Sequence, residues 1–288
     1  MSAVLGRCLR LIEASDLARD YGLTADELRP HAGGFNSDCW VADSKWFVKV
    51  WRRGTPEDLD LLCTLAATGL PVPAPLRTVA GELHAIAGGR PYAVFPYVHG
   101  RMATHDDWRP AAQALKRVHA LEHVDLPPAT LDEPAIWPLR DHLDHPWIAD
   151  RREEVVASIA RLEHTIERAR TKTVRHVVCH LDLHGLNLIL DDSDEIAAIV
   201  DWEQAVIGPR EHDVWIAAEG AHLEAFLTEY GARDLDSDHL EYALLARGLR
   251  DLAARVFNEV DRPGVDTWGF RRIAKLDTDL ARFRPFCR

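Results

Sequence analysis

The spacing of hydrophobic and polar residues changes about a hundred residues into the chain. Two short runs of aromatic and β-branched residues, 38–42 and 46–51, flank a polar tripeptide, which predicts an antiparallel hairpin with Lys49 in its second strand. Two further short strands are predicted at 76–79 and 91–97. The first hundred residues are therefore expected to be mainly β-sheet.

Two helices are predicted within this β-rich part. The segment from Thr24 to Glu27 has the spacing of a capping box, which predicts a short helix and makes residues 1–31 a helical preface to the sheet. Thr55-Pro56 offers a cap followed by proline at the first helical position. Apolar residues then recur on one helical face as far as Gly69, where this second helix is expected to end.

Beyond residue 100 the pattern is mainly helical. A long helix is predicted through Leu115 and Val118. Periodic, charged segments that predict surface helices follow at 151–170, 211–230, 238–256 and 267–283. The exception is a group of short apolar runs that predict strands at 174–179, 188–190 and 196–200. These strands are expected to enclose a polar loop.

That polar loop, residues 180–187, has the residues and spacing of a phosphoryl-transfer site. In phosphoryl transfer one Asp positions and deprotonates the attacking hydroxyl, while an Asn and a second Asp hold Mg²⁺ on the nucleotide phosphates. Asp182 and Asn187 have the spacing of the first two groups, and Asp201 follows the end of the next strand. We therefore expect Asp182 to be catalytic and Asn187 and Asp201 to bind the metal.

Upstream residues match the nucleotide-binding groups. Gly33-Gly34-Phe35-Asn36-Ser37 precedes the hairpin, and Gly34, Asn36 and Ser37 are expected to bring backbone close to the phosphates. Lys49 is expected to contact the α- and β-phosphates; the alternative is an outward lysine on an alternating strand. Asp58, with Glu57 as the fallback, is its expected acidic partner, although Asp58 also suits a structural charge at a helix N-terminus.

Together these residues resemble the aminoglycoside phosphotransferase and choline kinase-like superfamily, small-molecule kinases related in fold to protein kinases. The resemblance extends from about Gly33 to Trp215. Its characteristic pieces are the Lys49 strand, 69–73, 95–100, 180–187, 199–203, Gly208-Pro209 and Asp213.

The resemblance implies an α+β, bilobal protein-kinase-like fold. Its nucleotide-binding lobe would span 1–98 and its helical lobe, with the catalytic loop and substrate site, 99–288. Phe95 to Val98 would form the hinge, where the Pro96 carbonyl and the Val98 amide hydrogen-bond the adenine of ATP, with GTP as the alternative donor. The resemblance gives Asp213 a loop-supporting role. It makes His184 either a phosphate-proximal or a loop-bracing side chain.

Net charge, cysteine spacing and the length of apolar segments indicate which binding partners and which cellular location to expect. The 34 Lys plus Arg against 46 Asp plus Glu leave a net charge of −12, which disfavours nucleic acid and anionic membranes. Five scattered cysteines without CxxC spacing favour neither a disulfide framework nor a zinc site. No apolar segment has the length of a membrane span, and we expect a cytoplasmic protein.

The expected acceptor is a hydroxyl of a small molecule. An aminoglycoside or related cationic antibiotic agrees with both the resemblance and the acidic balance, which would make the chain a resistance kinase. Choline, homoserine and sugar acceptors are the alternatives.

Other classes of function fit the residues less well. His180, Asp182 and His184 alternate like ligands of a zinc hydrolase, but no second histidine cluster follows, and a buried brace is the preferred role for His180. A non-catalytic nucleotide-binding module is disfavoured because the base, metal and phosphate ligands are all present. A protein kinase is disfavoured because no A-P-E element follows Asp201.

Overall fold

A computed structural model describes residues 12–32, 37–52, 56, 58–258 and 268–288. The chain separates into two compact units. The first contains the described residues up to Ala103 together with Leu186–Glu203, and the second contains Thr104–Gly185 and Gln204–Arg288. The segment Leu186–Glu203 was expected in the second lobe but belongs to the first unit. Its strand around Ile189 and Leu190 pairs with the short strand Arg101–Met102, which also belongs to the first unit.

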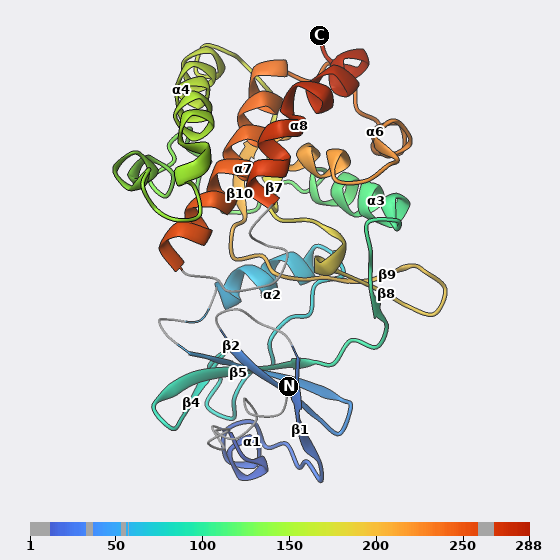
Figure 1. The fold of residues 1–288 in the computed structure, drawn as a ribbon. Coiled ribbons are helices and arrows are strands. Elements are labelled where there is room, and N and C mark those ends of the chain that lie inside the picture. The colour runs from blue at the N-terminus through green and yellow to red at the C-terminus, as the bar shows by residue number, and fades with distance from the viewer. Residues whose placement is uncertain (1–11, 33–36, 53–55, 57, 259–267) are drawn as a thin grey trace. The chain divides into compact units, whose positions relative to one another are not determined.

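The first unit is built on a five-stranded antiparallel sheet with the order β1-β2-β3-β5-β4 (Figure 1). Its strands are β1 (Leu28–His31), β2 (Ser37–Ala42), β3 (Trp46–Trp51), β4 (Ala85–Ala87) and β5 (Arg90–Pro96). Alternation along β3 turns Val48 and Val50 into a core that also contains Trp40, Tyr92 and Val94. The predicted hairpin is confirmed, with Lys49 on the opposite face of β3 from those two valines.

The predicted helix at Thr24 is wrong. The helix of this region is α1 (Ala14–Tyr21), and the chain after it forms β1, which pairs with β2. The Asp43 carboxylate accepts hydrogen bonds from the backbone N–H groups of Asp26 and Glu27, at 3.1 and 2.8 Å. In a helix beginning at Thr24, these N–H groups would lie in the first turn and would need a capping side chain. Here the β2–β3 turn accepts them, and no helix forms despite the capping-box spacing.

Helix α2 (Leu59–Ala67) begins later than predicted and ends as predicted before Gly69. Asp58 is its N-cap, because its carboxylate accepts the N–H of Leu61 at 2.9 Å. Thr55, the predicted cap, lies outside the described residues. The strand predicted at 76–79 is absent; its first residue, Leu76, donates its N–H to the Val94 carbonyl, but the chain then turns at Gly81.

A second, three-stranded sheet completes the first unit. Its strands are β6 (Arg101–Met102), β8 (Leu188–Leu190) and β9 (Ile196–Ile199), in the order β6-β8-β9. The strands predicted for these two apolar runs are confirmed, and the structure shows that β8 and β9 form an antiparallel hairpin. The N–H of Ile199 also donates to the Pro71 carbonyl at 2.7 Å, which ties the hairpin to the segment after α2.

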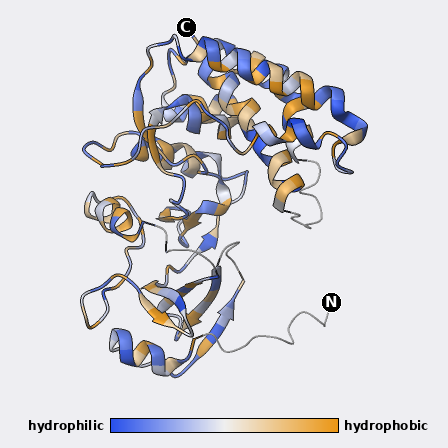
Figure 2. Cartoon of the chain, turned by 90° about the vertical axis from the view of Figure 1, so that its left-hand side faces the viewer, coloured by the Kyte–Doolittle hydropathy of each residue, from blue (hydrophilic) through white to orange (hydrophobic). Residues whose placement is uncertain are grey.

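The second unit is mainly helical, in agreement with the sequence pattern. Its helices are α3 (Trp108–Val118), α4 (Arg152–Ala169), α5 (Glu211–Val214), α6 (Leu223–Tyr230), α7 (Ser237–Asn258) and α8 (Trp268–Phe283). A two-stranded sheet pairs β7 (His176–Cys179) with β10 (Val206–Pro209), a strand that the sequence pattern did not reveal. The helices in Figure 2 carry both hydrophobic and hydrophilic residues, as expected for helices with one buried face.

Two of the predicted surface helices differ from expectation. The segment 211–230 is broken into α5, a 3₁₀ turn (Trp215–Ala218) and α6, and α5 is buried. α7 is a central helix, because α4, α5 and α8 all pack against it. None of the described helices combines the length and the apolar composition needed to cross a bilayer.

Gly100 offers a test of how β6 and β8 pack. Its φ is 150°, and an added Cβ would collide with the carbonyl oxygen of Leu190. We expect Gly100→Ala to lower the free energy of unfolding by about 2 kcal/mol or more, because strain and overpacking add. Gly89→Ala is the control: its φ is 78° but nothing lies near the new Cβ, so about 1 kcal/mol is expected. Equal losses in urea unfolding would show that the collision is relieved.

Candidate active site

Asp213 of α5 holds the start of the polar loop. Its two carboxylate oxygens accept the backbone N–H groups of His180 at 2.7 Å and of Leu181 at 2.5 Å. Leu181 has a φ of 64°, a conformation that costs energy for a residue with a side chain. The two hydrogen bonds offset that cost, and the loop-supporting role expected for Asp213 is confirmed.

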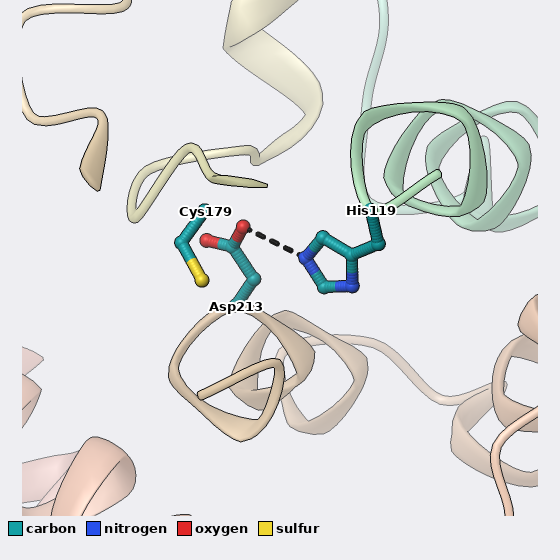
Figure 3. Close-up of side chains that lie close together, drawn as sticks. All are labelled: His119, Cys179 and Asp213. Carbon is teal, nitrogen blue, oxygen red and sulfur yellow. Dashed lines mark hydrogen bonds and ion pairs between the residues drawn. The ribbon is translucent and has the colours of Figure 1, made fainter. Parts of the chain in front are cut away.

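The Asp213 carboxylate is itself fixed by His119, the C-cap residue of α3 (Figure 3). His119 Nε2 lies 3.0 Å from Asp213 Oδ2, and His119 Nδ1 lies 2.7 Å from the hydroxyl of Tyr230. All three side chains are buried. The loop is thus supported by a hydrogen-bonded chain that runs from α6 through α3 to α5.

Cys179 lies beside this pair, and the ligand atoms of His119, Cys179 and Asp213 all lie within 4.8 Å of one another. The cluster is better explained as a structural network than as a metal centre. Cys179 Sγ is 3.4 Å from the carbonyl oxygens of Gly208 and Pro209, and burial raises the pKa of the thiol well above its usual value. A thiol that remains protonated is a poor metal ligand.

Asp182, the predicted catalytic residue, is held by groups from two parts of the second unit. Arg247 Nη1 of α7 donates to Asp182 Oδ1 at 2.6 Å, and His184 Nε2 lies 3.6 Å from Oδ2. Burial acts to raise the pKa of Asp182, but the hydrogen bond with His184 and the charge of Arg247 outweigh it and lower the pKa to about 2. The carboxylate is therefore ionised at neutral pH.

His180 is a buried brace, as preferred from the sequence. Its side chain has 0% exposure, and its Nδ1 accepts the N–H of Asp182 at 3.3 Å. Within the described part of the chain, the three-ligand cluster is that of His119, Cys179 and Asp213, not the alternating set expected for a zinc hydrolase. The sequence alternative of a zinc site at His180, Asp182 and His184 thus has no geometric support.

The two predicted metal ligands lie in the first unit and leave the same end of the β8–β9 hairpin. Leu188 pairs with Ile199, and the N–H of Val200 donates to the Asn187 carbonyl at 3.0 Å. Asn187 directly precedes this pairing and Asp201 closely follows it. Asp201 is exposed and has a φ of 70°. Backbone pairing thus brings an amide-bearing and a carboxylate-bearing residue together.

Lys49 reaches the same region from β3. Its Nζ lies 3.2 Å from Oε1 of Glu203, two residues after Asp201, and 5.4 Å from the centre of the Trp51 ring. Glu203 is the last residue of the 199–203 motif, and the sequence pattern assigned it no role. Asp58 has the alternative, structural role as the N-cap of α2, and an ion pair between Lys49 and Asp58 stays a prediction.

The remaining predicted nucleotide contacts divide into three groups. Gly34 and Asn36, like the fallback Glu57, lie outside the described residues. Ser37 opens β2 with its side chain buried and its Oγ 3.6 Å from Cys39 Sγ. At the end of β5, Phe95 is buried, Pro96 is exposed and Val98 is half-buried. Contacts of these residues with a nucleotide stay predictions.

The brace on the loop can be tested with Asp213→Asn. A carboxamide has one acceptor oxygen and cannot receive both loop N–H groups and the imidazole, so a buried donor loses its partner. We expect the free energy of unfolding to fall by about 1–3 kcal/mol. Asp192→Asn, an exposed carboxylate in the turn between β8 and β9, is the matched control and should change stability by less than about 0.5 kcal/mol. A loss for Asp213→Asn no larger than for the control would contradict the brace.

Comparison with known proteins identifies the family. The model of the phosphotransferase enzyme family matches residues 27–246, more than two thirds of the chain. A search of curated protein sequences gave no match.

Several solved structures share the fold. Spectinomycin phosphotransferase APH(9)-Ia, solved with ADP and spectinomycin, is 16% identical with a TM-score of 0.73, covering 94% of this chain and 97% of its own. APH(4)-Ia, solved with AMP-PNP and hygromycin B, is 16% identical with a TM-score of 0.64, covering 92% and 98%. A choline/ethanolamine kinase family protein from Mesorhizobium loti is 14% identical with a TM-score of 0.61, covering 90% and 92%.

These similarities agree with a β-sheet N-terminal region and a helical C-terminal part. The resemblance inferred from the sequence motifs is confirmed. The chain belongs to the phosphotransferase enzyme family and is a small-molecule kinase.

Proposed function

We propose that this enzyme transfers the γ-phosphate of ATP to a hydroxyl of a small molecule, with an aminoglycoside or related cationic antibiotic as the acceptor class. The observation that carries the proposal is the position of the expected metal ligands at the β8–β9 hairpin. The hairpin brings Asn187 and Asp201 to one end, while Lys49 is joined by an ion pair to Glu203 close to Asp201. These three functional groups recur where proteins bind a metal–nucleotide complex.

The ligand chemistry at this end suits Mg²⁺. Asn187 and Asp201 offer an amide oxygen and a carboxylate, and Mg²⁺ prefers oxygen donors. When bound, Mg²⁺ supplies charge neutralisation on the β- and γ-phosphates. Lys49 is expected to exchange Glu203 for the α- and β-phosphates when nucleotide binds, because an ammonium group is attracted more strongly by a polyanion than by one half-exposed carboxylate.

Asp182 is the proposed catalytic residue. Its carboxylate accepts a hydrogen bond from the acceptor hydroxyl and aligns the oxygen with the γ-phosphorus. The new oxygen–phosphorus bond forms as the bond to the β–γ bridging oxygen breaks, ADP departs, and the hydroxyl proton passes to Asp182. A carboxylate with a pKa of about 2 is a weak base, so its main contribution is orientation, with proton transfer late in the reaction.

The nucleotide and the adenine contacts are proposed by analogy with the structural relatives. Relatives with the same fold were solved with ADP, AMP or AMP-PNP, and one aminoglycoside kinase was solved with GDP. The Pro96 carbonyl and the Val98 amide are the proposed adenine partners; Pro96 is the exposed last residue of β5, and Val98 follows it by two positions. Gly34, Asn36 and Ser37 are the proposed phosphate-loop residues, and His184 is proposed to brace the loop beside Asp182.

The acceptor class rests on the antibiotic-binding relatives and on charge. Relatives were solved with spectinomycin, kanamycin, hygromycin B or gentamicin. The net charge of −12 favours approach of a cationic acceptor to the protein. We propose on this basis a cytoplasmic resistance kinase. A metabolite kinase is the second candidate, favoured by the choline/ethanolamine kinase family relative.

Substitution of the two carboxylates tests the catalytic assignment. Asp182→Asn and Asp201→Asn should each lower kcat for ADP release by about a hundredfold or more, because the contributions of hydroxyl orientation and of metal ligation are of that size. Thermal unfolding should show that both variants fold. Turnover above roughly a tenth of the wild-type value in Asp182→Asn would contradict an essential role for this carboxylate.

Substitution of the lysine tests the nucleotide site. Lys49→Ala should raise KM for ATP by about tenfold or more, because charge-assisted hydrogen bonds to phosphate are lost. Lys45→Ala is the matched control, since Lys45 is an exposed lysine in the turn that precedes β3. Titration of ATP at saturating acceptor separates the two variants; equal KM values would exclude Lys49 from the phosphate site.

The acceptor is found by a coupled ADP-release screen over hydroxyl-bearing compounds. The panel contains spectinomycin, kanamycin and hygromycin B as antibiotics, with choline, homoserine and simple sugars as metabolites. Acceptor-dependent turnover with an antibiotic, lost in Asp182→Asn, is the expected result. Turnover only with a metabolite would transfer the assignment to the second candidate.

A further inference from the structure

Arg247 is a positively charged residue that the sequence motifs did not single out, and it contacts the proposed catalytic carboxylate directly. It lies near the middle of α7, sixty-five positions from Asp182 along the chain. Its Nη1 donates to Asp182 Oδ1 at 2.6 Å, and both side chains are largely buried, with exposures of 18% and 14%. A charge pair at this distance and burial is much less screened than a surface pair.

The guanidinium of Arg247 is held in place from other sides as well. It lies over the buried ring of Trp215, 4.9 Å from the ring centre. Its Nε lies 3.5 Å from Oδ1 of Asp251, one helical turn further along α7. Because an aromatic face and a second carboxylate both restrain it, Arg247 is a fixed part of the unit, unlike a surface arginine that can leave its partner.

The restraint continues into α8. Arg272 forms ion pairs with Asp251 and, at 2.9 Å, with Glu219, and it also lies over the Trp215 ring. Charges therefore alternate along the row Asp182, Arg247, Asp251, Arg272 and Glu219. Each of the two arginines lies between two carboxylates. Displacement of Arg247 would therefore leave the negative charges of Asp182 and Asp251 only partly compensated inside the protein.

We propose that Arg247 is a positioning residue that fixes the Asp182 carboxylate for phosphoryl transfer. The inference rests on the proposed catalytic role of Asp182. Arg247 occupies Oδ1 and so orients the plane of the carboxylate, while His184 faces Oδ2. Misplacement of a reacting group by about 1 Å can cost a hundredfold in rate, so a contact of this kind affects kcat.

The groups that face Asp182 define what a pH titration reports. On its own loop these are His184, beside Oδ2, and the buried His180, which accepts the Asp182 N–H. From α7 it is Arg247. Asp182 has a lowered pKa in the folded protein, so it is ionised above that value, and removal of Arg247 should move its titration upward.

The test compares Arg247→Met, Arg247→Lys and Arg161→Met with the wild type. Methionine retains much of the length but removes the charge, and lysine restores the charge without the guanidinium geometry. Arg161→Met is the matched control, because Arg161 pairs with Glu241 of α7 and Asp277 of α8. Circular dichroism checks that each variant is folded at every pH used.

The first measurement is a carbon-detected NMR titration of aspartate carboxyl groups, with the Asp182 signal assigned by its absence in Asp182→Asn. In the wild type and in Arg161→Met we expect no titration of Asp182 between about pH 4 and pH 8, since an ion pair of this kind lowers an aspartate pKa by about 1–3 units. In Arg247→Met the midpoint should rise by about 1–3 units, and in Arg247→Lys it should stay close to the wild type. An unchanged midpoint in Arg247→Met overturns the proposal.

The second measurement is kcat for ADP release against pH, with water and with spectinomycin as acceptors. Arg247→Met should lose about tenfold to a hundredfold in kcat with KM for ATP unchanged, and its acid limb should move to higher pH. Arg247→Lys should recover part of the loss. A kcat profile for Arg247→Met equal to that of Arg161→Met overturns the positioning role. If Asp182→Asn retains turnover, the proposed function fails, whereas the titration still reports the ion pair.

Discussion

The buried carboxylate of Asp213 is the group on which the geometry of the polar loop depends. Removing a carboxylate from water is costly unless hydrogen bonds compensate, and here two backbone N–H groups and an imidazole do so. In return, the loop backbone is held with Leu181 in a left-handed conformation. The short helix α5 is buried for this reason, although its charged sequence is typical of a surface helix.

The loop contributes to both compact units. Residues up to Gly185 belong to the helical unit, where Asp182 contacts Arg247, whereas Asn187 and the strand after it belong to the β-rich unit. The proposed metal-ligand pair and the proposed catalytic carboxylate therefore have separate supports. One is backbone pairing within the β8–β9 hairpin, and the other is a row of alternating charges anchored on α7 and α8.

Sequence patterns were most reliable where one local signal decided the structure. The β2–β3 hairpin, the strands β8 and β9 and most long helices were predicted because their hydrophobic spacing is regular. The signals failed where a distant residue competed. At Thr24 no helix forms, because the backbone N–H groups of Asp26 and Glu27 donate to the Asp43 carboxylate. The regular pattern of 211–230 is interrupted by a 3₁₀ turn and the bend around Gly220.

The sequence by itself determined the chemical groups of the proposed site and their order, because the spacing of Asp182, Asn187 and Asp201 is a property of the chain. The tertiary structure alone decided the partners of those groups. Glu203 lies 154 positions from Lys49, and Arg247 lies 65 positions from Asp182, in a helix without a recognisable motif. Contacts over such separations arise from packing, which local periodicity and propensity do not encode.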